Sequence, residues 1–450
     1  MPPSHPHTAR ALVLLGFLAL GAAAGCRTLE ELPDRLLDRR TPRERYVDGL
    51  AASGLDGTAL AGDWLRAAER ALAEAPTVAA SHAEEGYLTP AEPVAIAYRV
   101  PARRGQVIRV EVTLPGDSTT QVFLDAWQAV ADTLPPRHVV SADSGARHLE
   151  VDPRRDGDYI IRIQPELLRG GRFSVRLEVA PTLAFPVIRG RESDVGSRWG
   201  ADRDGGARSH QGIDIFAPRG TPVVAARSGV IRRVEETGRG GKVVWLTDDA
   251  GNRLYYAHLD SQAVSRGQRV EQGDTLGTVG NTGNAITTPP HLHFGVYRSG
   301  EGAVDPWWFV HRPRVNPPRL AADTTRFGDW VRTAAEGILL RSEPDARGTE
   351  GSALPRHTAA RVVAAVGSWY RVRLPDGAMG YLPAASAEPI EESLGRVEGA
   401  PRTQVLANLS TQGHPEAILA ANATSDSLAI LGRFGSYLLV RTDSGLSGWV

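Results

Sequence analysis

The sequence predicts a mainly β, multidomain protein with a helical segment near its N-terminus. The chain has 450 residues, which is about three domains' worth of length. Long stretches alternate apolar and polar side chains with a period of two, a pattern typical of β-strands. The 48 glycines and 31 prolines supply the turns that many short strands require.

The composition excludes several function classes. The 51 basic and 52 acidic residues balance, so the basic face of a nucleic-acid-binding protein is not expected. Lys242 is the only lysine, which excludes lysine-based chemistry elsewhere in the chain. The one cysteine, Cys26, rules out a disulfide framework and a cysteine-rich zinc site. A metal would therefore have to be held by histidine and carboxylate.

Residues 1–25 are expected to be an export signal. Arg10 precedes an apolar run over 11–25 that is too short to span a bilayer and that ends in small residues. Because Cys26 follows directly, the segment resembles a bacterial lipoprotein signal. The resemblance implies acylation of Cys26 and an exported, periplasmic or cell-surface lipoprotein, anchored at the outer membrane because Arg27 replaces a retention aspartate. A plain secretory signal followed by an incidental cysteine is the alternative.

Residues 26–82 are predicted to form a helical stem. Thr41-Pro42-Arg43-Glu44 has the form of a capping box with proline in the first turn. Apolar side chains then recur at helical spacing, at Leu60, Trp64, Leu65, Ala68 and Leu72. No residue of this segment is a candidate for chemistry.

Residues 86–182 are predicted to form a small β-sandwich. Apolar side chains alternate with polar ones over 108–114, 159–163 and 173–179. Strands of this kind bury one face, and Gly/Asp turns separate them.

Four of the twelve histidines fall between residues 210 and 293. His291 and His293 are two apart in a run that continues with alternating apolar residues. On a strand, such residues leave the same face, so the two imidazoles are expected side by side. Two adjacent polar rings need hydrogen-bond partners or a metal.

His210 and Asp214 are four residues apart, and Asp214 is flanked by Ile213 and Ile215, which are expected on the opposite face. In an extended segment this spacing places His210 and Asp214 on one face. Together with a second histidine they would supply an N, O, N ligand set for Zn²⁺, and a catalytic zinc takes three protein ligands.

The third segment, LYYAHLD, is expected to place Tyr256 and His258 on the same face of a strand. The His-Glu-x-x-His motif, in which glutamate is the base, is absent from the sequence. Proton transfer would therefore fall to a histidine, and His258 is the best candidate for a role other than metal binding.

These segments occur in the order of a known family. SHQGIDIFAPRGTPVVAARSGVI, LYYAHLDS, VSRGQRVEQGDTLGTVGNTGN and HLHF resemble the lysostaphin/LytM-type zinc metallopeptidases over residues 184–310. The resemblance implies a β peptidase domain in which His210, Asp214 and His293 bind Zn²⁺. It implies that His258 and His291 flank the attacking water, and that the substrates are peptides of peptidoglycan stems or cross-bridges. Gly295 stands where many relatives have glutamate.

A proline-rich linker is predicted over 311–329, followed by a repeat with an offset of 68 residues. Gly367-Ser368-Trp369 matches Gly435-Ser436-Tyr437, and Gly380-Tyr381-Leu382 matches Gly448-Trp449-Val450. The two copies, 330–390 and 397–450, resemble small bacterial SH3-like barrels, which commonly bind cell-wall peptides. A passive spacer is the alternative.

Two further interpretations of the whole chain stay open. The first is a catalytically inactive LytM-like regulator, although all five site positions are filled. The second is a wall-binding lipoprotein that activates other murein hydrolases. A lipoyl-type carrier domain is excluded, because Lys242 does not lie in the required turn.

Overall fold

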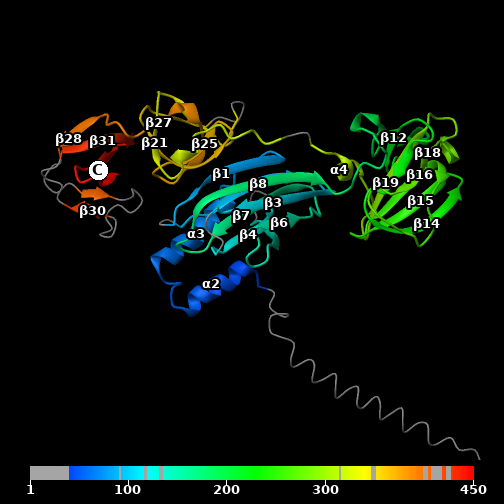
Figure 1. Cartoon of the computed structure of the whole chain (residues 1–450), viewed down its shortest axis with the longest axis horizontal. Coiled ribbons are helices and arrows are strands. Elements are labelled where there is room, and N and C mark those ends of the chain that lie inside the picture. The colour runs from blue at the N-terminus through cyan, green and yellow to red at the C-terminus, as the bar shows by residue number, and fades with distance from the viewer. Residues whose placement is uncertain are drawn as a thin grey trace, which may run out of the picture. The chain divides into compact units, whose positions relative to one another are not determined.

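Strands dominate the computed structural model, as the sequence predicts (Figure 1). The structure describes residues 40–90, 93–115, 119–130, 135–313, 316–345, 351–398, 404–406, 418–421 and 427–450. The predicted signal peptide and Cys26 lie outside the described residues. The chain divides into two compact units between Gly57 and Thr58.

The first unit contains helix α2 (Pro42–Ala52), which begins with the predicted capping box. The backbone N–H of Glu44 donates to Thr41 Oγ1 at 3.1 Å, and the N–H of Thr41 donates to Glu44 Oε2 at 2.6 Å. These two bonds satisfy backbone donors that the first turn of a helix leaves without partners.

The second unit begins with helix α3 (Ala59–Ala73), which packs on strand β7 (Gly157–Pro165). Trp64 is 1% exposed, and its indole N–H donates to the carbonyl of Pro165 at 2.8 Å. The side-chain amide of Gln164 donates back to the carbonyl of Trp64 at 2.8 Å. The large ring is therefore buried with its polar atom satisfied.

The strands that follow α3 in the chain form two antiparallel sheets, which enclose a common apolar core. One sheet has the order β2 (Ile96–Ala102), β7, β4 (Val122–Gln128) and β5 (Arg137–Ser141). The other includes β1 (Ser81–Leu88), β8 (Gly171–Pro181), β3 (Gln106–Thr113) and β6 (His148–Val151). Strand β1 begins five residues before the start predicted for the sandwich.

The predicted alternation is confirmed over residues 108–113 of β3 and 173–179 of β8, where apolar residues are buried and polar residues are exposed or half-buried. It is wrong for β7, which is buried on both faces from Tyr159 onward. The second face of β7 is covered because α3 packs there, with Ala71 and Leu72 against Ile160. Arg162, on that same strand, is paired with buried Asp125 at 2.7 Å.

Three of the four histidines of interest, His258, His291 and His293, lie on strands of a ten-stranded sheet, and His210 lies in a loop beside it. Its main order is β17 (Arg269–Val270), β14 (Gly229–Thr237), β15 (Gly241–Asp248), β16 (Arg253–Gln262), β19 (His291–Arg298), β12 (Ile213–Phe216) and β9 (Val195–Ser197) (Figure 1). Three further strands branch from this order: β18 (Thr275–Val279) pairs with β16 and with β13 (Pro222–Val224), and β20 (Gly302–Val304) pairs with β19. One face is a closed apolar core that includes Ile213, Ile215, Tyr256, Leu292 and Phe294. The opposite face carries the polar side chains.

The 68-residue repeat is confirmed as a repeated three-stranded unit. Strands β24 (Ala359–Val366), β25 (Trp369–Arg373) and β26 (Met379–Pro383) correspond to β31 (Ser427–Phe434), β32 (Tyr437–Arg441) and β33 (Ser447–Trp449). Gly367 and Gly435 each turn the chain with φ of 57°, a conformation that favours glycine. Further strands complete each copy: β21 (Trp330–Thr333), β22 (Ile338–Leu340), β23 (Ser352–Leu354), β27 (Ala387–Pro389), β28 (Gly395–Glu398), β29 (Gln404–Leu406) and β30 (Ile418–Ala421).

The first copy of the repeat continues the sheet that contains β1. Strand β24 pairs antiparallel with β1 through Glu85–Ala365 and Gly86–Ala364. A Cβ atom at Gly86 would lie 2.4 Å from the carbonyl oxygen of Val363, so a larger residue would separate the two strands. The result is one nine-stranded sheet built from segments far apart in sequence.

Candidate metal centre

Three donor atoms converge on the open face of the ten-stranded sheet. Asp214 on β12 and His293 on β19 are register partners, and His210 lies in the loop before β12. His210 Nε2 is 3.0 Å from Asp214 Oδ1 and 3.0 Å from His293 Nδ1, and His293 Nδ1 is 2.9 Å from Asp214 Oδ1. They are the one cluster of candidate metal ligands among the residues that the structure describes.

The donor triangle fits a tetrahedral zinc ion. Ligands at about 2.0–2.1 Å from zinc lie roughly 3.3 Å from one another, close to the separations in this triangle. Two nitrogens and a carboxylate oxygen are ligand types that zinc accepts. The set also leaves a fourth tetrahedral position for water.

A backbone carbonyl sets the tautomer of His210. His210 Nδ1 lies 2.9 Å from the carbonyl oxygen of Arg198, which can only accept, so Nδ1 carries the proton. Nε2, the His210 atom of the triangle, is then unprotonated, and its lone pair is available to bind a metal. This is the usual second-sphere arrangement for a metal-binding histidine.

The second carboxylate oxygen of Asp214 has its own partner. Arg203 Nη2 donates to Asp214 Oδ2 at 2.6 Å and to Ser197 Oγ at 2.7 Å. Burial alone would raise the pKa of Asp214, but its contacts with the imidazoles of His210 and His293 hold that pKa well below its usual range. The carboxylate is therefore ionised, as a metal ligand must be.

His258 and His291 stand beside the triangle. Their ring centroids are 5.1 Å apart, and the ring of His258 is 5.9 Å from that of His293. His258 Nδ1 lies 2.9 Å from the carbonyl oxygen of Thr282, and His291 Nδ1 lies 2.8 Å from that of Pro289. Each ring thus donates through Nδ1 and keeps Nε2 free to accept a proton.

Burial lowers the pKa of His258 to about 4, and the neighbouring His293 adds to the effect. Burial likewise lowers the pKa of His293. His258 is therefore a neutral imidazole at pH 7 and can accept a proton there.

Residues 208–306 match the model of peptidase family M23. The chain carries a peptidase M23 domain. It is 36% identical over 135 residues to an L-Ala–D-Glu endopeptidase of Bacillus subtilis, covering 28% of this chain and 41% of the relative. It is 39% identical over 90 residues to a peptidoglycan DD-endopeptidase of Vibrio cholerae, covering 20% of each chain. The chain thus spans less than half the length of these curated relatives.

The M23 domain is also similar to a solved structure. The catalytic domain of lysostaphin from Staphylococcus simulans is 35% identical to it. That comparison covers 25% of this chain and 86% of the solved chain, with a TM-score of 0.23.

The prediction that Tyr256 and His258 share a strand face is wrong. Tyr256 lies in the core of the M23 domain, with its ring centroid 5.3 Å from that of Phe294. A register shift against β15 and a left-handed φ of 61° at His258 turn that histidine to the opposite face. A β-bulge therefore re-aims the side chain, and a strained non-glycine conformation of this kind is common at functional sites.

The expectation of one extended segment from His210 to Asp214 also needs correction. Strand β12 begins only at Ile213, and His210 lies in the preceding loop. A Cβ atom at Gly212 would lie 2.6 Å from Cε1 of His293. Glycine therefore lets the loop pass close enough to His293 for His210 to reach the triangle.

Arg203 was not predicted from the sequence. It lies in a Gly/Asp-rich hairpin, β10 (Asp202–Arg203) and β11 (Arg208–Ser209), whose pattern gives no sign of a contact with Asp214. The carbonyls of Arg198, Thr282 and Pro289 could not be found from sequence either, because any residue supplies one.

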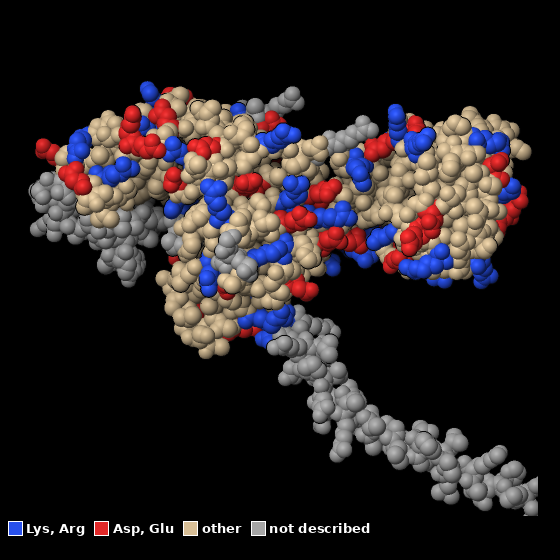
Figure 2. All heavy atoms as spheres, in the orientation of Figure 1, with Lys and Arg blue, Asp and Glu red and all other residues tan. Residues whose placement is uncertain are grey.

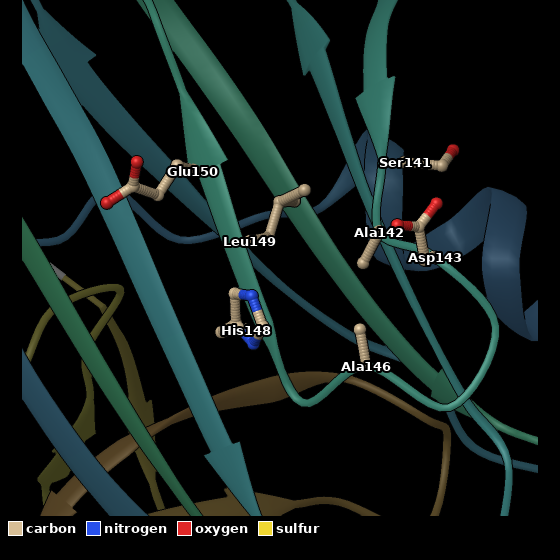
Figure 3. A pocket seen from close by; sticks show the side chains of 7 residues that line it. All are labelled: Ser141, Ala142, Asp143, Ala146, His148, Leu149 and Glu150. Atoms are coloured by element: carbon tan, nitrogen blue, oxygen red, sulfur yellow. The ribbon is translucent and has the colours of Figure 1, made fainter.

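A pocket of about 460 Å³ lies outside the M23 domain, between β5 and β6. It is lined by Ser141, Ala142, Asp143, Ala146, His148, Leu149 and Glu150. Figure 3 shows Asp143 and Glu150 on opposite sides of it, so its carboxylates do not converge on one point. Figure 2 shows basic and acidic side chains interspersed on the visible face, in keeping with the net charge of −1.

Proposed function

We propose that the M23 domain is a zinc-dependent endopeptidase that hydrolyses peptide bonds in peptidoglycan stems or cross-bridges. The observation that carries this proposal is the triangle of His210, Asp214 and His293 with two further histidines beside it. The substrate class is suggested by the names of the relatives from Bacillus subtilis and Vibrio cholerae.

The ligand residues would be His210 through Nε2, Asp214 through Oδ1 and His293 through Nδ1. Zinc bound there would polarise the scissile carbonyl and lower the pKa of water toward about 7. Arg203 fixes the orientation of the Asp214 carboxylate by binding its other oxygen.

His258 and His291 would handle the protons. His258 is held neutral by burial, so its free Nε2 accepts the proton of the attacking water. Because Nε2 of His291, on the neighbouring strand β19, carries no proton at the start, His291 can protonate the leaving amine only after taking up the proton that His258 removed from the water. The carbonyls of Thr282 and Pro289 keep both rings oriented by accepting from Nδ1.

The test combines metal content with cleavage of purified peptidoglycan by the full chain. We expect one equivalent of zinc and release of uncrosslinked peptides that a chelator abolishes. His210→Ala and His293→Ala should lose zinc, whereas His258→Ala should keep zinc and lose most activity. His148→Ala, at an exposed position on β6, is the matched control. Zinc binding without cleavage would favour the regulatory alternative, and loss of zinc in His258→Ala would refute its assignment.

We also propose that the protein is exported and held in the envelope by a lipid on Cys26. Among the described residues, no helix is long and apolar enough to cross a membrane. Metabolic labelling with a fatty acid tests the proposal: Cys26→Ser should abolish labelling and release the protein from the membrane fraction. Labelling that persists in the variant would contradict it.

The repeats at 330–390 and 397–450 are proposed to be SH3-like modules that bind cell-wall peptides. Their matching turns and strand order support a duplicated module. Pull-down of the full chain and of a chain ending at residue 390 on purified peptidoglycan tests the second copy. Equal retention of the two chains on peptidoglycan would mean that the second copy is a passive spacer.

A further inference from the structure

A row of aromatic side chains lies next to the metal triangle on the open face of the sheet. In the strand register, Ala257, His293 and Asp214 are neighbours across β16, β19 and β12. Two residues further along the strands, the neighbours are Trp245, Tyr255 and Gly295. Because residues two apart on a strand share a face, this second row lies on the same face, roughly 7 Å from the first.

The aromatic rings of this row touch one another and reach the metal site. The ring centroids of Trp245 and Tyr255 are 4.4 Å apart, and those of Trp245 and Tyr297 are 5.1 Å apart. The ring of Tyr255 is also 5.8 Å from His293. The three aromatic rings form a continuous half-buried surface, which we call the aromatic platform: Trp245, Tyr255 and Tyr297.

Gly295 leaves the aromatic platform uninterrupted by a further side chain. A Cβ atom there would contact the ring of Tyr297 at 3.2 Å and Cβ of Tyr255 at 3.5 Å, so any side chain would project between the two tyrosines. Gly295 itself is buried, and with glycine at this position no further side chain separates the two tyrosine rings.

Three arginines surround the far end of the aromatic platform. A register shift in β14 places Arg232 and Arg233 opposite Trp245, and Arg253 lies on β16 next to Tyr297 in the register. Together with Trp245 and Thr247 they line a hollow of about 190 Å³. All three arginines are exposed, and the one carboxylate paired with any of them is Glu235, 3.9 Å from Arg233, among the described residues.

We propose that the aromatic platform and these arginines form a subsite for a carboxylate-bearing segment of the peptide substrate. The inference rests on the proposed function and narrows its substrate class to anionic peptides, as opposed to neutral ones such as glycine bridges. Guanidinium groups bind carboxylates through paired hydrogen bonds, and aromatic faces support the adjoining peptide. Arg253 is four residues from Ala257 on β16, so the carboxylate would lie about 13 Å from the scissile bond, the span of about four extended residues.

The test measures binding apart from cleavage. The probes are soluble muropeptides with free carboxylates and the same muropeptides after conversion of the carboxylates to carboxamides. Calorimetry uses the full chain carrying His258→Ala, which is expected to bind without cleaving. We expect the carboxylate form to bind about three- to tenfold more tightly. Adding Arg232→Gln with Arg233→Gln, or Arg253→Gln, should remove that preference. Arg269→Gln, at an exposed arginine paired with Asp249, should keep it.

The outcomes separate this inference from the proposed function. Equal binding of the two forms, no binding of either, or arginine variants that weaken both forms alike would overturn the subsite. Cleavage of peptidoglycan by the unmodified chain is assayed in parallel. Cleavage without a carboxylate preference would keep the endopeptidase and reject the subsite. A carboxylate preference that depends on the arginines, without cleavage, would keep the subsite and reject the endopeptidase.

Discussion

Glu84 and Arg371 form a buried ion pair, with Oε1 and Nη1 3.2 Å apart, although 287 residues separate them in the sequence. Glu84 lies on β1 and Arg371 on β25 of the first repeat copy. The hydroxyl of Tyr381 donates to Oε2 of the same carboxylate at 3.2 Å, and His82 Nε2 lies 3.3 Å from it. The contact therefore adds a buried polar cluster to the backbone pairing of β1 with β24.

Removing the negative charge of Glu84 should destabilise both segments together. In Glu84→Gln the guanidinium of Arg371 would stay buried without its counter-ion, which costs about 3–5 kcal/mol. We expect a clearly lower midpoint of thermal unfolding, measured by calorimetry on the full chain. Glu85→Gln is the control, because Glu85 is the exposed neighbour on the same strand. Equal midpoints for the two variants would show that the ion pair contributes nothing.

The same carboxylate should make stability depend on acid. Burial would raise the pKa of Glu84, but Arg371 and His82 outweigh it and lower that pKa from 4.5 to about 2. A carboxyl with a depressed pKa in the folded state stabilises fully above its unfolded pKa, and this stabilisation is lost as the pH falls through the folded pKa. We expect about 3 kcal/mol to disappear between pH 4.5 and about 2, as measured by denaturant unfolding. Glu84→Gln should lack this component, and an unchanged acid slope in that variant would contradict the assignment.

Arg203 is predicted to strengthen metal binding through Asp214. Its guanidinium binds the oxygen of Asp214 that does not face the two histidines, so Arg203→Gln frees the carboxylate to rotate. We expect a zinc affinity about 10- to 100-fold lower, measured by competition with a chromophoric chelator. Arg266→Gln is the control at an exposed position in the same domain. An affinity that rises in Arg203→Gln would mean that its positive charge opposes the metal more than its hydrogen bond helps.

Those parts of the site that depend on local pattern could be predicted from the sequence. His291 and His293 share a face because strand alternation is a property of neighbouring residues, and their strand is regular. The repeat was also predictable, because Gly367 and Gly435 mark the same turn in both copies.

Features that leave no signal in the local sequence could not be predicted. His258 turns to the site through a bulge and a left-handed φ in a segment without glycine, so the sequence there carries no signal of it. Strand β7 lost its expected exposed face because α3, about 100 residues earlier, covers it. The pairing of Glu84 with Arg371 likewise follows from the contact between β1 and the first repeat copy, which no local pattern encodes.

Gly295 offers a way to separate charge from volume on the aromatic platform. Gly295→Glu and Gly295→Gln fill the same space between Tyr255 and Tyr297, and the ring of Tyr297 must shift slightly in both. The glutamate alone adds a negative charge that competes for the arginines beyond Trp245 and repels an anionic ligand. We therefore expect Gly295→Glu to bind carboxylate muropeptides about threefold more weakly than Gly295→Gln, with no difference for the carboxamide form. Calorimetry in the His258→Ala background measures both affinities without cleavage. Equal losses in the two variants would mean that glycine is needed for space alone, and that charge plays no part in recognition at this position.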